Sequence, residues 1–254
     1  MIEAPRLTRR SLMGAAALML GGCDRLAGSD QTRRVLASAE TLTRSVHALI
    51  GAPAALATEY AQADIAPAFR ANGTTDPDTE EFQALVDSNF ADWRLDVGGL
   101  VERPAKFSLE ALRALPSRTQ ITRHDCVEGW SCIGKWQGAK LSALLDAVGV
   151  KPAARFVVFH CADALDRADP DAKYYESLDL AEAMHPQTIL AYEMNDSVLT
   201  VPHGAPLRLR AERKLGYKMA KYIMRLELVD SFDSIGGGKG GSWEDLGYDW
   251  YAGI

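Results

Sequence analysis

Residues 123–138 limit the possible fold and function of this chain more than any other stretch. They place a cysteine among charged, aromatic and glycine residues, directly before a clear helix pattern. The stretch reads RHDCVEGWSCIGKWQG. A free cysteine such as Cys126 is often no more than a small buried residue. Alternatively, Arg123 and His124 lower the pKa of the Cys126 thiol, and the thiolate then suits a soft metal ion. The residues alone leave both interpretations open, and they predict a loop around Cys126.

Eight residues in and just after this stretch stand at the spacing of a known signature. They are Cys126, Val127, Glu128, Trp130, Ser131, Trp136, Gly138 and Leu141. On these residues the chain resembles the sulfite-oxidase-type molybdopterin-dependent oxidoreductases, and most closely the periplasmic branch that reduces methionine sulfoxide. The resemblance implies that Cys126 ligates molybdenum. It also implies that Glu128 and Trp130 lie beside the metal or line the substrate funnel.

Two later segments carry the same resemblance. Residues 201–210 read VPHGAPLRLR and match the pattern N/H-G-A-P-x-R, and residues 215–221 read LGYKMAK. The resemblance implies that five residues here contact the pterin or its phosphate: His203, Arg208, Met219, Ala220 and Lys221. His203 stands where the most similar members have asparagine, so its contact is expected to differ.

Two weaker matches extend the implied cofactor site. Cys161 lies 35 residues after Cys126, where the family has a small polar residue, usually threonine, that contacts the pterin. A buried packing cysteine is the alternative for Cys161, and a disulfide with Cys132 is a further one. Asn72 lies in a loose Phe-x-Arg-Asn-like segment, which either touches the cofactor or only forms a turn with Gly73.

Six basic residues lie between positions 208 and 221, in a chain whose formal net charge is −6. They are Arg208, Arg210, Arg213, Lys214, Lys218 and Lys221. Either they form a solvated strand face, or they clamp the pterin phosphate, with Gly216 letting the backbone approach it closely. The acidic chain argues against nucleic acid as a partner, since nucleic acid demands a basic surface.

The N-terminus resembles a bacterial export signal. Residues 8–13 read TRRSLM, like a twin-arginine signal, and the apolar run at 15–20 is too short to span a bilayer. Residues 20–23 read LGGC and look like a lipoprotein cleavage box. We therefore expect a periplasmic protein held at the inner membrane by a lipid on Cys23. A plain signal peptide with a chance cysteine is the alternative.

The rest of the chain predicts a linking segment and a catalytic domain. Residues 24–75 form a helical stalk or a helix packed on the main domain, and residues 76–254 form the molybdopterin-binding catalytic domain. The resemblance implies an α+β fold with mixed β-sheets and short helices. Sequence patterns predict strands at 93–97, 155–160 and 222–228, and helices at 108–115 and 141–149. The tail at 236–251 either covers the active-site mouth or packs on the surface.

The implied cofactor is molybdenum held by one molybdopterin, with no haem in this chain. Electrons are then expected from a membrane cytochrome b-type subunit. The loop after Cys126 lacks the arginines with which sulfite oxidases hold an anion, and Glu128 would repel an oxyanion. We therefore expect oxygen-atom transfer that reduces a small-molecule sulfoxide or related S/N-oxide. Sulfite oxidation and a non-catalytic, cofactor-carrying binding module are the alternatives.

Overall fold

The computed structural model describes residues 55–165 and 172–254, together with a few single positions. These are Ser29, Gln31, Thr32, Ser38, Leu42 and Asp169. Contacts divide the chain into two compact units, Met1–Ala52 and Pro53–Ile254. The second unit thus begins before position 76, and it includes residues 55–75.

The predicted export signal at 1–23, with its lipid site Cys23, lies outside the described residues. Most of the segment from 24 to 54 also lies outside them, so the predicted stalk stays a prediction. Among the described residues, no helix combines the length and the apolar character that crossing a membrane requires.

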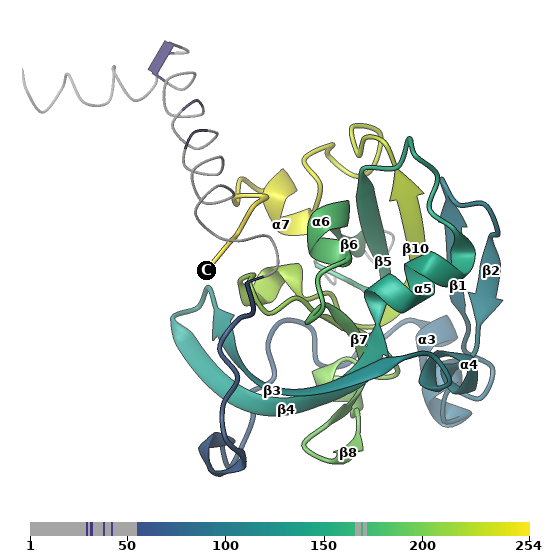
Figure 1. The fold of residues 1–254 in the computed structure, drawn as a ribbon, viewed down its shortest axis with the longest axis vertical. Coiled ribbons are helices and arrows are strands. Elements are labelled where there is room, and N and C mark those ends of the chain that lie inside the picture. Colours follow the sequence, from purple (N-terminus) through teal and green to yellow (C-terminus); the bar gives the residue numbers. More distant parts are fainter. Residues whose placement is uncertain are drawn as a thin grey trace, which may run out of the picture. The chain divides into compact units, whose positions relative to one another are not determined.

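The first sheet has five strands in the order β2-β1-β10-β5-β6 (Figure 1). Their bounds are β1 Leu95–Gly99, β2 Ala105–Phe107, β5 Phe156–Ala164, β6 Lys173–Asp179 and β10 Ile223–Val229. β1 and β10 run parallel and the other neighbours run antiparallel, so the sheet is mixed. Val157, Val158 and Phe159 are all buried in β5, because this interior strand is covered on both faces.

The second sheet has the order β3-β4-β7-β8, and β9 also pairs with β7. The bounds are β3 Ser117–Cys126, β4 Trp130–Lys140, β7 Ile189–Met194, β8 Ser197–Val198 and β9 Arg208–Arg210. β3 and β4 form a long curved ribbon, seen in teal in Figure 1. Its register continues until Cys126 lies opposite Trp130, so a strand reaches the cysteine where the sequence predicted a loop.

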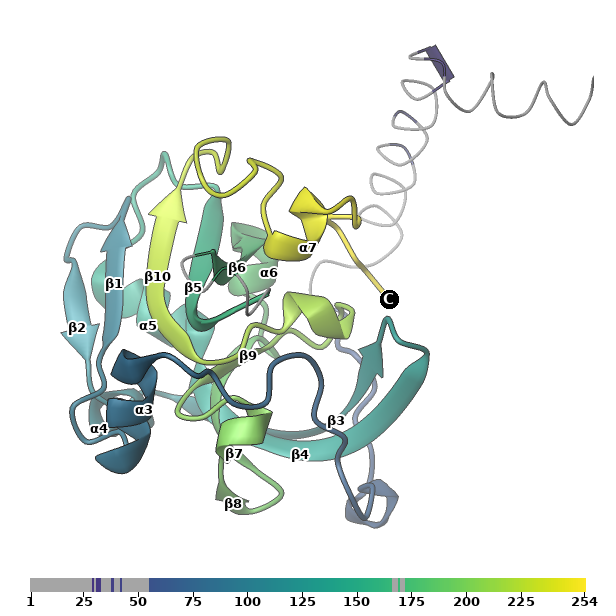
Figure 2. The same ribbon diagram turned by 180° about the vertical axis from the view of Figure 1, so that it is seen from behind.

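Residues 55–66 run beside the β3–β4 ribbon (Figure 2). The backbone N–H of Tyr60 donates to the carbonyl of Ile121 at 2.9 Å. The side chain of Gln187 imitates a backbone partner, because it accepts from Ala57 N at 2.7 Å and donates to Ala57 O at 3.0 Å. This segment covers an edge strand that would otherwise expose unpaired backbone groups.

Short helices complete the unit (Figure 1). They are η1 Gln62–Asp64, α3 Glu80–Asp87, α4 Leu109–Arg113, α5 Leu141–Val148, α6 Leu180–Ala183, η2 Val201–His203, η3 Gly216–Lys218 and α7 Ser242–Asp245. Ser108 caps α4, since its hydroxyl accepts from Ala111 N at 3.1 Å. Helix α5 ends at Gly149, whose φ of 72° suits glycine.

The predicted α+β class, with mixed β-sheets and short helices, is confirmed. The strands predicted at 155–160 and 222–228 are β5 and β10, and the helix predicted at 141–149 is α5. The C-terminal tail packs on β6 and beside η3, where Trp250 Nε1 donates to Ser177 Oγ at 2.8 Å.

The close approach of β4 and β7 generates a stability prediction. An added Cβ at Gly138 would lie 2.6 Å from the Cα of Ala191 and would also meet the carbonyl oxygen of Leu190. Gly138→Ala should therefore overpack two backbones and destabilise the protein by about 1–3 kcal/mol. Gly98→Ala in β1 is the matched control, because no atom lies within 4 Å of its added Cβ. Urea unfolding measures both, and equal stability of the two variants would contradict the prediction.

Candidate active site

Strand β3 directs its even-numbered residues toward the interior. Gln120, Thr122 and His124 are all buried, whereas Arg123 between them is exposed. Side chains alternate across a strand, so Cys126 continues the face of His124. His124 Nδ1 lies 3.3 Å from Met219 Sδ, which places this end of β3 beside residues 215–221, the last of the three segments that carry the resemblance.

The electrostatics around Cys126 differ from the sequence prediction. Arg123 binds Asp125 through its Nε at 2.9 Å. Burial and the charge of Arg210 hold the pKa of His124 well below its ordinary value, so its imidazole is neutral. Burial raises the pKa of the Cys126 thiol, and the charge of Glu128 adds to the rise. The prediction that Arg123 and His124 lower this pKa is therefore wrong, and a metal cation would itself be the main stabiliser of a thiolate here.

Glu128 and Trp130 lie in the β3–β4 turn and along the start of β4. Trp130 Nε1 donates to Glu128 Oε2 at 2.9 Å. Arg70 joins them from a distant segment: its Nη2 lies 3.7 Å from the same carboxylate, and its Cζ lies 5.2 Å from the Trp130 ring centroid. Sequence reasoning missed Arg70 as a site residue, because only the fold brings it beside Glu128. We call Arg70, Glu128 and Trp130 the rim.

Segment 69–74 carries Arg70 and the predicted Asn72. It is held by His203, which belongs to residues 201–210, the second segment that carries the resemblance. His203 Nε2 lies 3.1 Å from the carbonyl oxygen of Phe69. The Phe69 ring packs on the His203 ring at a centroid distance of 6.0 Å and on the Trp136 ring at 5.2 Å. His203 thus positions this segment through a backbone carbonyl.

Lys221 holds the other end of segment 69–74. Its Nζ donates to the carbonyls of Asn72 at 2.7 Å and Pro202 at 3.1 Å, and also to the carbonyl of Thr74. Burial and the charge of Arg208 lower the pKa of Lys221 to about 7. The three acceptors nevertheless match the three N–H groups of the ammonium form. The structure thus brings the predicted residues Asn72, His203 and Lys221 together.

The two arginines of β9 have different surroundings. Arg210 is neutralised by Glu212, with Nε–Oε1 at 2.9 Å and Nη2–Oε2 at 2.6 Å. Arg208 donates from Nη1 to the His203 carbonyl at 2.9 Å, but its Nε and Nη2 have no partner among the described residues. Burial lowers the pKa of Arg208 to about 9, and the charge of Arg210 contributes. Arg208 therefore has donors to offer a ligand.

The rest of the basic group is divided among other partners. Lys218 donates to Glu176 at 2.7 Å and to Glu244 at 2.5 Å. Arg213 pairs with Glu182 at 2.8 Å. The group is thus neither a solvated face nor a six-residue clamp, and Arg208 alone has unmatched buried guanidinium donors among the described residues.

Several buried hydrogen-bond donors without partners belong to Trp136 and its neighbours. Within the described part of the chain these are Arg208 Nε and Nη2, Trp136 Nε1 and His124 Nε2. The guanidinium carbon of Arg208 lies 4.8 Å from the Trp136 ring centroid. The Phe69 ring lies between the other two, with centroid distances of 5.2 Å to Trp136 and 5.8 Å to His124, so the three side chains are neighbours. Buried N–H groups are almost always paired, and leaving one unpaired costs about 1–3 kcal/mol. Such a donor-rich set fits an anionic ligand rich in acceptors, as a phosphorylated pterin is.

The remaining predicted residues are more enclosed. Cys161 is buried in β5, where burial raises the pKa of its thiol well above the ordinary value. Ala220 is also buried, and its carbonyl accepts from Leu209 N at 2.8 Å. Cys126, Cys132 and Cys161 are free, so the disulfide weighed between the last two does not form. No cluster of three or more His, Cys, Asp or Glu side chains among the described residues could hold a metal by itself.

Comparisons with known proteins agree with this geometry. Residues 82–234 match the family described as "Oxidoreductase molybdopterin binding domain". A putative protein-methionine-sulfoxide reductase subunit of Azospira oryzae is 36% identical over 99% of this chain and 89% of its own length.

Two further relatives are protein-methionine-sulfoxide reductase catalytic subunits. The Campylobacter jejuni protein is 35% identical over 56% of this chain and 50% of its own length. The Xanthomonas axonopodis protein is 32% identical over 66% of this chain and 52% of its own length. The matches therefore span about half of these two relatives. Taken with the family match, they show that this chain belongs to the oxidoreductases with a molybdopterin-binding domain, the sulfite oxidase family.

Proposed function

We propose that this chain binds molybdenum–molybdopterin and reduces a sulfoxide or related S/N-oxide by oxygen-atom transfer. The group of unmatched buried donors around Trp136, beside the strand that carries Cys126, is the observation that supports it most directly. The names of the three relatives favour methionine sulfoxide as the type of substrate.

Each residue of the site has a part in this proposal. Cys126 would supply the thiolate that ligates the metal, and Arg208 would offer Nε and Nη2 to the phosphate. His203 and Lys221 hold segment 69–74, in which the side-chain oxygen of Asn72 is buried and unmatched.

The other predicted cofactor residues enclose this arrangement. Met219 contacts His124, and the next residue, Ala220, is buried. Cys161 is buried in β5, where it lies opposite Ile223 of β10. The bound group supplies the redox change and oxygen-atom transfer that no ordinary side chain provides. The chain's part is to bind and orient that group and the substrate.

The rim sets the charge that a substrate meets. Arg70 partly offsets Glu128, so the rim is close to neutral and suits a neutral sulfoxide. The positive charge of Arg70 also reduces the repulsion that Glu128 alone would exert on an anionic substrate such as sulfite. Arg70 thus favours keeping sulfite oxidation as the second candidate function.

A separate electron carrier completes the proposal. The Azospira relative is described as a subunit, which supports an assembly with a partner. We propose a membrane cytochrome b-type protein as the donor, because a reductase of this kind must be re-reduced after every turnover and we expect no haem in this chain.

Replacement of the metal ligand tests the function. Cys126→Ser should abolish turnover, because a hydroxyl is a harder and far less acidic ligand than a thiol. Cys132→Ser is the matched control and should keep activity. The assay follows oxidation of a reduced dye by methionine sulfoxide, and ferricyanide reduction by sulfite runs beside it. Turnover only with sulfite would favour the second function, and molybdenum content without any turnover would favour the non-catalytic module.

Removal of the proposed phosphate contact tests the cofactor site. Arg208→Ala should weaken cofactor binding about 10- to 100-fold, since a hydrogen bond to a charged group contributes about 1.5–3 kcal/mol. Arg225→Ala is the control, because this arginine pairs with Glu227 on β10 at 3.0 Å. Molybdenum and pterin per protein are measured after dialysis. Equal retention in the two variants would argue against the assignment of Arg208.

We propose periplasmic export by the twin-arginine route and lipid attachment at Cys23, from the order of the motifs in residues 8–23. Multiple acyl chains would hold the protein at the inner membrane, whereas one chain binds only marginally. In cell fractionation, wild type should be found with the membrane, and Cys23→Ala should be found in the soluble periplasm. Wild type in the soluble periplasm would refute the anchor, and normal export after Arg9 and Arg10 become lysine would refute the route.

A further inference from the structure

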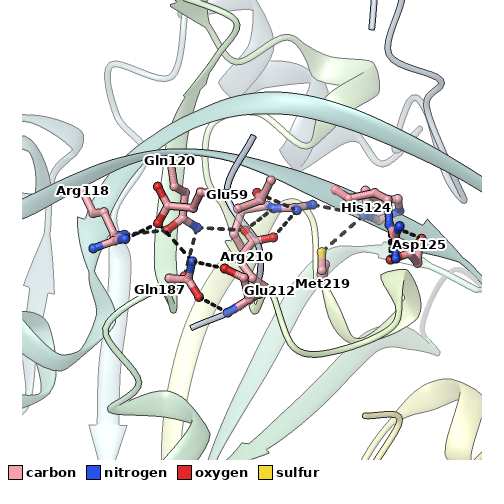
Figure 3. A network of polar contacts seen from close by, with 12 residues as sticks. Glu59, Arg118, Gln120, His124, Asp125, Gln187, Arg210, Glu212 and Met219 are labelled. Atoms are coloured by element: carbon pink, nitrogen blue, oxygen red, sulfur yellow. Dashed lines mark hydrogen bonds and ion pairs between the residues drawn. The ribbon is translucent and has the colours of Figure 1, made fainter. Parts of the chain in front are cut away.

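A buried polar network ends at His124, and the function proposed above gives no role to the rest of this network. Figure 3 shows it running from Gln187 through Gln120 and Glu212 to Arg210 and His124. Gln120 Nε2 donates to the Gln187 carbonyl at 3.0 Å and to Glu212 Oε1 at 2.8 Å. The network thus connects the inner face of β3 to β9.

Arg210 is fixed within this network. The side chains of Arg210 and Glu212 are 0% and 1% exposed, and two parallel hydrogen bonds join them. A bidentate pair of this kind sets the plane of the guanidinium as well as its place. The remaining nitrogen, Nη1, is thereby aimed at His124 Nδ1, at a distance of 3.1 Å.

This contact determines which ring nitrogen of His124 carries the proton. A guanidinium has only donors, so His124 Nδ1 must accept the hydrogen bond from Arg210. The sulfur of Met219, 3.3 Å from the same nitrogen, cannot donate a proton either. A neutral imidazole has one N–H, and here that N–H is therefore on Nε2.

The Nε2–H group is buried and has no acceptor among the described residues. Gly216 makes room for it, since a Cβ at this position would lie 2.5 Å from His124 Cε1 and closer still to Nε2. The absent side chain at 216 therefore accommodates this ring, where the sequence suggested an approach to phosphate. Together with Arg208 and Trp136, His124 gives three neighbouring side chains with unmatched buried donors.

We propose that His124 is a cofactor-binding residue whose Nε2–H donates to an anionic acceptor of the bound molybdenum cofactor, and that Arg210 and Glu212 are positioning residues that impose this tautomer. The inference rests on the cofactor site proposed above. It assigns to the network a role in orientation, because each of the three nitrogens of Arg210 already has a partner within the network.

Two substitutions of His124 separate its two nitrogens. In His124→Asn the amide lies near the position of Nδ1, so it accepts from Arg210 but offers no distal donor. In His124→Gln the amide nitrogen reaches the position of Nε2 and restores that donor. We expect the asparagine variant to bind the cofactor about 10-fold or more weakly, and the glutamine variant to recover much of the loss. His185→Asn is the control, a buried histidine that bonds Ala55 instead.

Molybdenum and pterin per protein, measured after dialysis of variants with cooperative unfolding, give the first readout. The ring nitrogens of ¹⁵N-labelled His124 give a second one, without turnover. Cofactor-free wild type should show the Nε2–H tautomer, and loading should shift this nitrogen and slow exchange of its proton. An Nδ1–H tautomer, or equal retention by wild type and a folded asparagine variant, overturns the proposal. Equal losses in both variants overturn it as well. Wild type without any cofactor would refute the proposed function itself, whereas the other outcomes would leave that function standing.

Discussion

Positive charge that is buried away from water must be matched atom by atom, and much of this structure is arranged to meet that requirement. Arg210 is matched by Glu212, Lys218 by Glu176 and Glu244, and Lys221 by three carbonyls. Arg208 is the exception among these buried cations, with two nitrogens that no described residue matches. The contrast supports the cofactor contact proposed for Arg208, because buried polar groups are almost always paired and an unmatched one calls for a partner.

The sequence predicted well those features that local rules control. The cap at Ser108, the apolar face of α5 and the buried run of β5 follow from short patterns, and the structure confirms them. The strand around Cys126 was predicted as a loop, because its buried residues Gln120, Thr122 and His124 are themselves polar. Without an apolar–polar alternation, the two-residue period of a strand is invisible in the sequence.

The contacts that define the site are mostly long-range, and here sequence reasoning reached only part of the way. Arg70 lies beside Glu128 although 58 positions separate them, and no local signal marks that approach. The six basic residues looked like one group in the sequence, but their partners come from scattered carboxylates and carbonyls. The resemblance pointed to Arg208 as a ligand contact, and the unmatched nitrogens give a physical reason for preferring it over Arg210.

Lys221 has a consequence for how the proposed cofactor site would receive its ligand. One ammonium group joins the carbonyls of Asn72, Thr74 and Pro202, so it acts as a non-covalent cross-link between segments that are distant in sequence. Ordering a free loop when a ligand arrives subtracts from affinity, because each immobilised residue loses entropy. In this protein the entropy of segment 69–74 is lost during folding, so one wall of the proposed site would already have its shape when a cofactor arrives. Under that proposal the chain is a preorganised receptor, and the segment does not have to close around its ligand.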